Sequence, residues 1–213
     1  METLKINKNF SVYKTDLGDG VFDSEPELKK LLLEFLDKNK NGGEILKNLA
    51  FVCEIIIGNV AEFIVGEKFQ FRNKNKVGIQ LWIGDNFKNW VLEPMKSEKV
   101  SLTKNSKLKK FSLVKPMNDT EIKDELQNLN PIAVEIFLPL LWDMLSLQKN
   151  GEARKLGLLN NGCANIFHVK LQDGRVVAVR VGWDGDEWRL LACGLDCVVR
   201  WFGGFAFFTL ATA

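Results

Sequence analysis

The sequence has little of what most metal and catalytic sites require. It contains a single histidine, His168, and four cysteines in 213 residues. One histidine makes a histidine-based metal site or a Ser-His-Asp triad hard to assemble. The cysteines are too sparse to indicate a disulfide framework, so free thiols are expected. The residue types therefore give little support to catalysis.

Long apolar segments are also missing. The closest approach to a membrane span is residues 43–66, which Lys47, Glu54 and Glu62 interrupt before the roughly 18 apolar residues that a span needs are reached. The N-terminal stretch METLKINKNF has neither an apolar core nor a cleavage site, so no signal peptide is predicted. We expect no membrane span and a cytoplasmic location, although export by another route stays open.

Charge does not point to a nucleic-acid partner. The formal net charge is +2, with 29 basic and 27 acidic residues. Basic residues gather between Lys96 and Lys115, but Ser, Thr and Asn accompany them. This segment is interpreted as solvated loop flanking a strand rather than as a nucleic-acid patch.

The N-terminal third has helical patterning. A helix is expected to begin at Asp23 or Ser24, with Pro26 in its first turn, and to end at the Asn-Gly-Gly of residues 41–43. Apolar residues at helical spacing predict a second helix over 44–65. We therefore treat residues 1–70 as a helical segment of unknown role, either separate from residues 71–213 or part of the same domain.

The middle of the chain contains both helical and strand-like patterns of apolar residues. Strands are predicted over 69–71 and 78–83, followed by a short helix that stops before Pro94 and a strand ahead of Pro116. Helix-start chemistry at Asn118 and an apolar run over 131–147 predict two further helices, the second with a kink at Pro139.

From Asn165 onward the period is two, which indicates strands. Asp173-Gly174 and residues 184–186 mark turns, and 205–210 is expected to be the last strand. The predicted class is α+β: N-terminal helices, then a domain that ends in an antiparallel strand meander.

The tail from Ala178 to Ala213 differs in amino-acid composition from the rest of the chain. It lacks Lys, Asn, Gln, Ser, Ile and Met, which are common upstream. Alternate residues on one side are apolar and are predicted to form the core, whereas the other side mixes charge, glycine, cysteine and phenylalanine. Such a patch usually marks a partner surface. The alternative is that these residues pack under an N-terminal helix or against another subunit. The predicted core set is Val179, Val181, Trp183, Trp188, Leu190 and Trp201.

The segments DGRVVAVRVGWDGDEWRLLACGLD and RWFGG resemble the variable region of proteins that diversity-generating retroelements diversify. The likeness extends upstream through KNGEARKLGLLNNGCANIFHVK, MNDTEIKDEL and, more faintly, IGDNFKNWVLEP. It covers residues 78–213 loosely and 158–207 well, and the segments resemble target proteins encoded by nanoarchaea and candidate-phyla bacteria. Residues 1–70 show no resemblance.

The resemblance implies a C-type-lectin-like domain over 71–213 with a variable region at about 178–213. In that family a reverse transcriptase scrambles template adenines, chiefly in Asn codons, which yields Asp, Gly, Arg, Leu, Val, Cys, Phe or Ala but never Trp or Glu. Trp183, Trp188, Trp201 and Glu187 would then be constant. The implied ligand-binding residues are Arg180, Gly182, Asp184, Gly185, Asp186, Arg189, Leu191, Cys193, Cys197, Val199, Phe202, Gly203 and Phe205.

The function implied is binding of a macromolecule, expected to be a protein, without catalysis. Phe202, Phe205, Leu191 and Arg189 would be the main anchors. The calcium signatures of lectins, Glu-Pro-Asn and Trp-Asn-Asp, are absent, so no metal and no cofactor is expected.

Two alternatives stay open. Formylglycine-generating oxidases share the lectin fold and use a cysteine pair, for which Cys193 and Cys197 are candidates, although the RGGS-type segment of that family is missing and the spacing is shorter. Otherwise the apolar tail would seal an oligomer, as a structural module.

Overall fold

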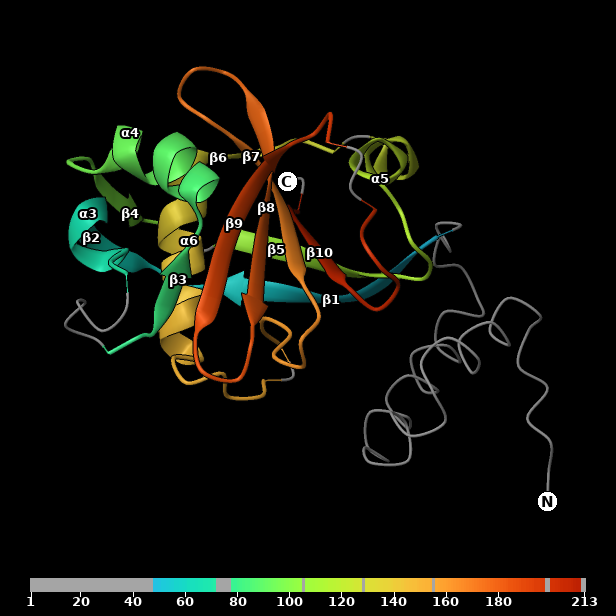
Figure 1. Cartoon of the computed structure of the whole chain (residues 1–213), viewed down its shortest axis with the longest axis horizontal. Helices are drawn as coiled ribbons and strands as arrows, with labels where there is room; N and C mark the ends of the chain where they lie inside the picture. Colours follow the sequence, from blue (N-terminus) through green and yellow to red (C-terminus); the bar gives the residue numbers. More distant parts are fainter. Residues whose placement is uncertain are drawn as a thin grey trace. The chain divides into compact units, whose positions relative to one another are not determined.

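The computed structural model describes residues 48–71, 78–104, 106–127, 129–154, 156–197 and 200–211 (Figure 1). The chain divides into two units, Met1–Ile45 and Leu46–Ala213, and all described residues belong to the second. The helix expected to begin at Asp23 or Ser24 lies outside the described residues. Residues 49–70, in contrast, belong to the same unit as the C-terminal strands.

One large sheet is the framework of this unit. Its strands follow the order β1-β5-β10-β7-β8-β9-β3, and β6 also pairs with β7. A second sheet consists of β2 (Val60–Ile64) and β4 (Lys99–Leu102). The strands of the large sheet are β1 (Leu49–Ile57), β3 (Leu81–Ile83), β5 (Ser106–Leu113), β6 (Ile132–Ala133), β7 (Asn165–Lys170), β8 (Val176–Trp183), β9 (Trp188–Gly194) and β10 (Ala206–Leu210).

Few helices accompany the sheets, so the predicted α+β class is confirmed. No helix in the described part of the chain is long and apolar enough to cross a membrane. The helices are α3 (Val65–Lys68), the π-helix η2 (Phe87–Leu92), α4 (Glu93–Met95), α5 (Asp119–Leu126) and α6 (Val134–Leu147).

The helix predicted over 44–65 is wrong. Residues 49–57 form β1, which pairs antiparallel with β5, and residues 60–64 form β2. Ile55 and Ile57 are buried while Glu54 and Ile56 are exposed, an alternation that a strand requires. Three consecutive β-branched isoleucines also favour a strand, because their side chains are restricted in a helix.

Other predictions in the middle of the chain hold in part. Residues 69–71 form no strand, and β3 begins only at Leu81. The short helix is present but does not stop before Pro94, because η2 runs on directly into α4, which contains Pro94. The helix start at Asn118 is confirmed by a capping box, in which Asn118 and Glu121 exchange hydrogen bonds.

The C-terminal meander is confirmed. β7 pairs antiparallel with β8, and β8 with β9. β10 runs between β5 and β7, antiparallel to the first and parallel to the second, so it lies inside the sheet. α6 follows from residue 134, lies behind the sheet in Figure 1, and contains Pro139.

Each side of the sheet carries a core. The larger core contains Val179, Leu190 and Phe137 of α6. The smaller core lies on the opposite side, where Ile122 of α5 packs with Ala178 and other residues. Trp201 is buried, as predicted for the core set, but it lies in this smaller core and not on the inward side that Val179 occupies. The difference arises because Trp201 follows an irregular connection, across which alternation along β9 cannot be extended.

Candidate ligand-binding surface

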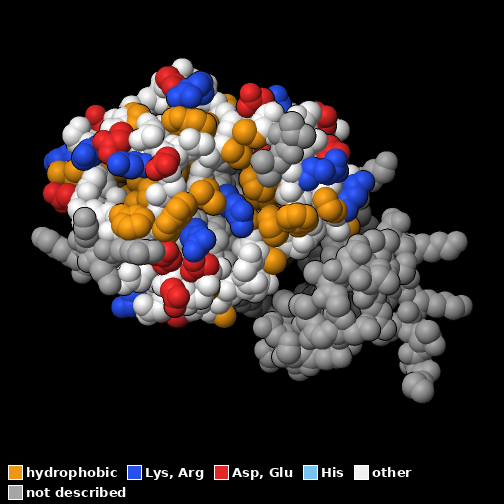
Figure 2. All heavy atoms as spheres, in the orientation of Figure 1, with side chains coloured by type: hydrophobic (Ala, Val, Ile, Leu, Met, Phe, Trp, Pro, Cys, Tyr) orange, Lys and Arg blue, Asp and Glu red, His pale blue; other side chains and the backbone are white. Residues whose placement is uncertain are grey.

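The side of β8 and β9 that turns away from α6 is called the outward face here. The strand register places Arg180 opposite Leu191 and Gly182 opposite Arg189, so these four residues share it. Arg180 and Arg189 are exposed, and Gly182 and Leu191 are half-buried. Hydrophobic, basic and acidic side chains lie next to one another over these strands in Figure 2.

A buried framework alternates with these residues. Val179, Val181, Trp188 and Leu190 are 0% exposed and lie in the larger core. Each such apolar side chain contributes roughly 1.5–3 kcal/mol by leaving water. The indole N–H of Trp188 also donates to the carbonyl oxygen of Gln148 at 2.7 Å. The backbone that carries the outward face is therefore held from beneath.

Asp184 organises the turn between β8 and β9. Its Oδ1 atom accepts hydrogen bonds from the backbone N–H groups of Asp186, at 3.2 Å, and Glu187, at 3.0 Å. Burial opposes ionisation of Asp184, but these N–H groups and the Arg189 guanidinium lower its pKa on balance. Gly185 has φ of +107°, a conformation that strains any residue with a Cβ atom. Gly185 is therefore less free to vary than the sequence analysis expects.

Arg189 joins this turn to a neighbouring strand. Its Nε atom lies 2.5 Å from the Asp184 carboxylate, and its guanidinium carbon lies 5.6 Å from the ring centroid of Trp82. β3 and β9 run parallel, and Trp82 of β3 pairs with Arg189 of β9. The ion pair and the cation–π contact hold Arg189 flat against the face.

Sequence reasoning missed the contribution of β3. Trp82 is half-buried beside Arg189, and a Cβ atom on Gly84 would come within 2.7 Å of the Leu191 side chain. The Asn86 amide donates to the carbonyl oxygen of Ala192 at 3.2 Å. β3 and β9 are far apart in the sequence, so no local pattern could show that they pair.

Cys193 and Cys197 have different surroundings. Cys193 is half-buried, and burial, with Asp119 and Cys197 nearby, raises the pKa of its thiol to about 12. Cys197 is exposed, and its backbone N–H donates to the carbonyl oxygen of Gly194 at 3.1 Å. In the part of the chain that the structure describes, no three His, Cys, Asp or Glu residues are placed to hold a metal ion.

Phe202 and Phe205 form a second apolar area near α5. Phe202 is 65% exposed, and its ring meets that of Phe205 edge-on, with centroids 5.8 Å apart. Between them in sequence, Gly204 donates its N–H to the carbonyl oxygen of Leu113, which ties this segment to β5. Arg200 donates to the Pro116 carbonyl oxygen at 2.9 Å.

Buried polar contacts hold α5 under this segment. The indole N–H of Trp201 donates to Asp119 Oδ1 at 2.9 Å, and His168 Nε2 lies 2.6 Å from the same oxygen. Trp201, Asp119 and His168 are all buried. The contacts fix the residue that precedes Phe202, so Phe202 is presented from an anchored backbone.

Most of the implied ligand-binding residues that the structure describes are accessible and fall in two areas rather than one, whereas Cys193 and Phe205 pack against the smaller core. Val199 lies outside the described residues. Exposed residues are Arg180, Asp184, Gly185, Asp186, Arg189, Cys197 and Phe202, and half-buried ones are Gly182, Leu191, Cys193, Gly203 and Phe205.

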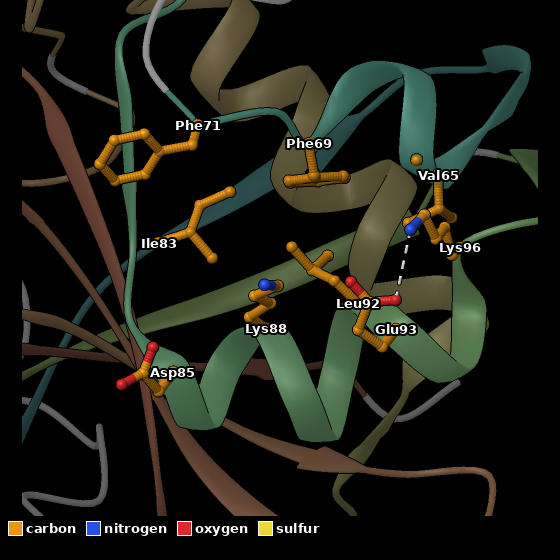
Figure 3. A pocket seen from close by; sticks show the side chains of 10 residues that line it. Val65, Phe69, Phe71, Ile83, Asp85, Lys88, Leu92, Glu93 and Lys96 are labelled. Atoms are coloured by element: carbon orange, nitrogen blue, oxygen red, sulfur yellow. Dashed lines mark hydrogen bonds and ion pairs between the residues drawn. The ribbon is translucent and has the colours of Figure 1, made fainter.

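A separate pocket lies on the core side of β3. It has a volume of about 340 Å³, and η2 and α4 form one wall (Figure 3). Ile83 of β3 lines it, whereas the neighbouring Trp82 pairs with Arg189 on the outward face. Successive residues of a strand point to opposite sides, so the pocket and the outward face are distinct places.

Comparison with known proteins gives no further guide: no family model, no curated protein and no solved structure matches this chain.

Proposed function

We propose that the chain is a hypervariable binding protein of the kind that diversity-generating retroelements diversify. Its outward face and the Phe202–Phe205 area would bind a macromolecular ligand, most simply a protein, without catalysis. The finer fold proposed is a C-type-lectin-like scaffold, in which the meander of β7, β8 and β9 carries the variable residues. No metal or cofactor is part of the proposal.

One observation carries it: along β9, accessible residues of types that retroelement mutagenesis can produce alternate with buried framework residues, among them Trp188, a type that it cannot produce. Arg189 and Leu191 are accessible, whereas Trp188 and Leu190 are 0% exposed. A surface built in this way can change its side chains while its backbone stays fixed. Burial raises the pKa of the Cys193 thiol, which favours its protonated form over the thiolate.

The DNA around the gene tests the origin of the surface. We expect a nearby repeat of the segment that encodes residues 178–213, differing from it only at adenines, together with a reverse-transcriptase gene. Sibling copies should differ at Arg180, Arg189 and Phe202 and agree at Trp183 and Trp188. Copies that vary at Trp188 while keeping Arg189 would rule the proposal out.

A binding experiment tests the use of the surface. Variants with Arg180, Arg189 and Leu191 randomised would be displayed and selected against lysozyme as a model protein. Binders should emerge whose affinity is lost when the selected side chains are returned to Ala, while a matched library randomised at exposed Lys123, Asp124 and Lys107 gives none. Equal success of the two libraries would contradict a specialised face.

A further inference from the structure

The pocket behind β3 has an apolar interior and a charged rim. Val65, Phe69 and Leu92 are buried in its walls, Ile83 is half-buried, and Phe71 is 42% exposed. A volume of about 340 Å³ lies at the lower end of the range for small-molecule sites. The walls therefore suit a compact apolar group of about the size of one or two fused rings.

The charged groups at the rim differ in whether they form ion pairs. Lys96 lies 3.4 Å from Glu93, so these two groups neutralise each other. Lys88 forms no ion pair with any residue that the structure describes. Figure 3 shows the Lys88 side chain directed between Ile83 and Leu92, whereas Asp85 stands at the edge. Of the two rim charges that form no ion pair with a described residue, Lys88 and Asp85, Lys88 is the one directed toward the apolar walls.

The element that carries Lys88 is itself uncommon. Phe87–Leu92 forms a π-helix, in which the Glu93 N–H donates to the carbonyl oxygen of Lys88. π-helical turns are rare, and they occur frequently at functional sites. Lys88 and Leu92, four residues apart on this element, both line the pocket.

We propose that this pocket binds a small amphipathic organic anion, with its apolar body against Phe69, Phe71 and Ile83 and its carboxylate or sulfonate at Lys88. The anionic group is specified by the unpaired ammonium, and the apolar body is specified by the walls. The site is independent of the proposed function, because it lies on the other side of β3 from Trp82 and Arg189.

Two probes with the same ring skeleton test the proposal. Anilinonaphthalene sulfonate carries the anionic group, and phenylnaphthylamine lacks it. Each would be titrated into the full chain and followed by fluorescence, with amide NMR spectra to locate the binding. We expect the sulfonate probe to bind more tightly, with shifts confined to residues around 65–96.

Three variants sharpen the test. Lys88→Gln should weaken the sulfonate probe about three- to five-fold, the range of an exposed ion pair, and leave the neutral probe unchanged. Phe71→Ala should weaken both probes about three-fold or more. Lys123→Gln removes the same charge from exposed α5 and should change neither.

Thermal melts of all variants would confirm that each is folded. The proposal is overturned if Lys88→Gln and Lys123→Gln behave alike, or if neither probe binds. It is also overturned if the shifts map to Arg189 and Leu191, which would show that the probe binds the outward face. That last result would not contradict the proposed function. Conversely, a missing template repeat would contradict the proposed function but not the ligand pocket.

Discussion

Cys193 and Cys197 lie close in sequence, but the structure gives their thiols different reactivity. Cys197 is exposed, whereas burial raises the pKa of Cys193 to about 12, with Asp119 as the next cause. A raised thiol pKa favours the protonated form, and the thiolate is the nucleophile. Raising the pH therefore does not activate Cys193 until it approaches that value.

The prediction concerns alkylation by iodoacetamide. Near pH 8, iodoacetamide should alkylate Cys197 and leave Cys193 unmodified. Near pH 10, only about one Cys193 in a hundred is a thiolate, so Cys193 should still be alkylated more slowly than Cys197. Mass spectrometry of peptides, with Cys193→Ser and Cys197→Ser proteins as controls, makes the assignment. Equal rates at the two thiols near pH 8 would contradict the assigned surroundings.

At the scale of the elements, helix α5 is joined to the rest of the unit through a buried polar contact at Asp119. Asp119 stands at its first turn and accepts from Trp201 while it contacts His168 of β7, and its second oxygen, Oδ2, is buried without a hydrogen-bond partner in the described residues. Removing this carboxylate leaves two buried groups without an acceptor. The helix would lose one of its polar links to the sheet, and the Glu125 carboxylate, which accepts from the backbone N–H of Leu49 in β1, would remain.

Asp119→Ala should therefore lower the free energy of unfolding by about 2–5 kcal/mol, because two buried groups each lose their hydrogen-bond acceptor. Asp124→Ala, at an exposed position of the same helix, is the control and should change it by about 0.5 kcal/mol or less. Urea denaturation followed by tryptophan fluorescence measures both. Similar midpoints for the two variants would show that the contact contributes little.

The sequence predicts elements well where local chemistry decides them. The capping residues at Asn118, the turn at Asp173-Gly174 and the alternation along β8 and β9 all report on neighbours in the chain. It fails over residues 44–65, where apolar residues satisfy helical and strand spacing alike and the pairing with β5 decides. Pairing of distant segments also explains why the sequence predicts neither the place of Trp82 beside Arg189 nor that of Trp201 in the smaller core.

At the scale of the whole molecule, the accessible residues and the framework should differ sharply in their effect on stability. Arg180→Ala and Phe202→Ser should each change the free energy of unfolding by about 0.5 kcal/mol or less, because both side chains are exposed. Leu190→Ala should cost about 2–5 kcal/mol, because it empties a fully buried site. Gly185→Val should cost an intermediate amount, about 1–2 kcal/mol, from its positive φ.

Urea unfolding of these four proteins measures the order. A cost for Phe202→Ser as large as that of Leu190→Ala would mean that Phe202 supports the fold rather than a ligand. Under the proposed function, this order would limit diversification: most accessible positions would tolerate change, whereas Gly185 in the turn would not.

The position of β10 has a consequence for how the protein is made. β10 leaves the ribosome after every other strand of the sheet, yet it fills the slot between β5 and β7 and contributes Phe207 and Phe208, both 0% exposed. A nascent chain therefore cannot close the sheet until residues 178–205 have been translated in frame. A chain that ends just before β10 would leave β5 and β7 each with one unpaired edge and would lack the Phe207 and Phe208 side chains in the core.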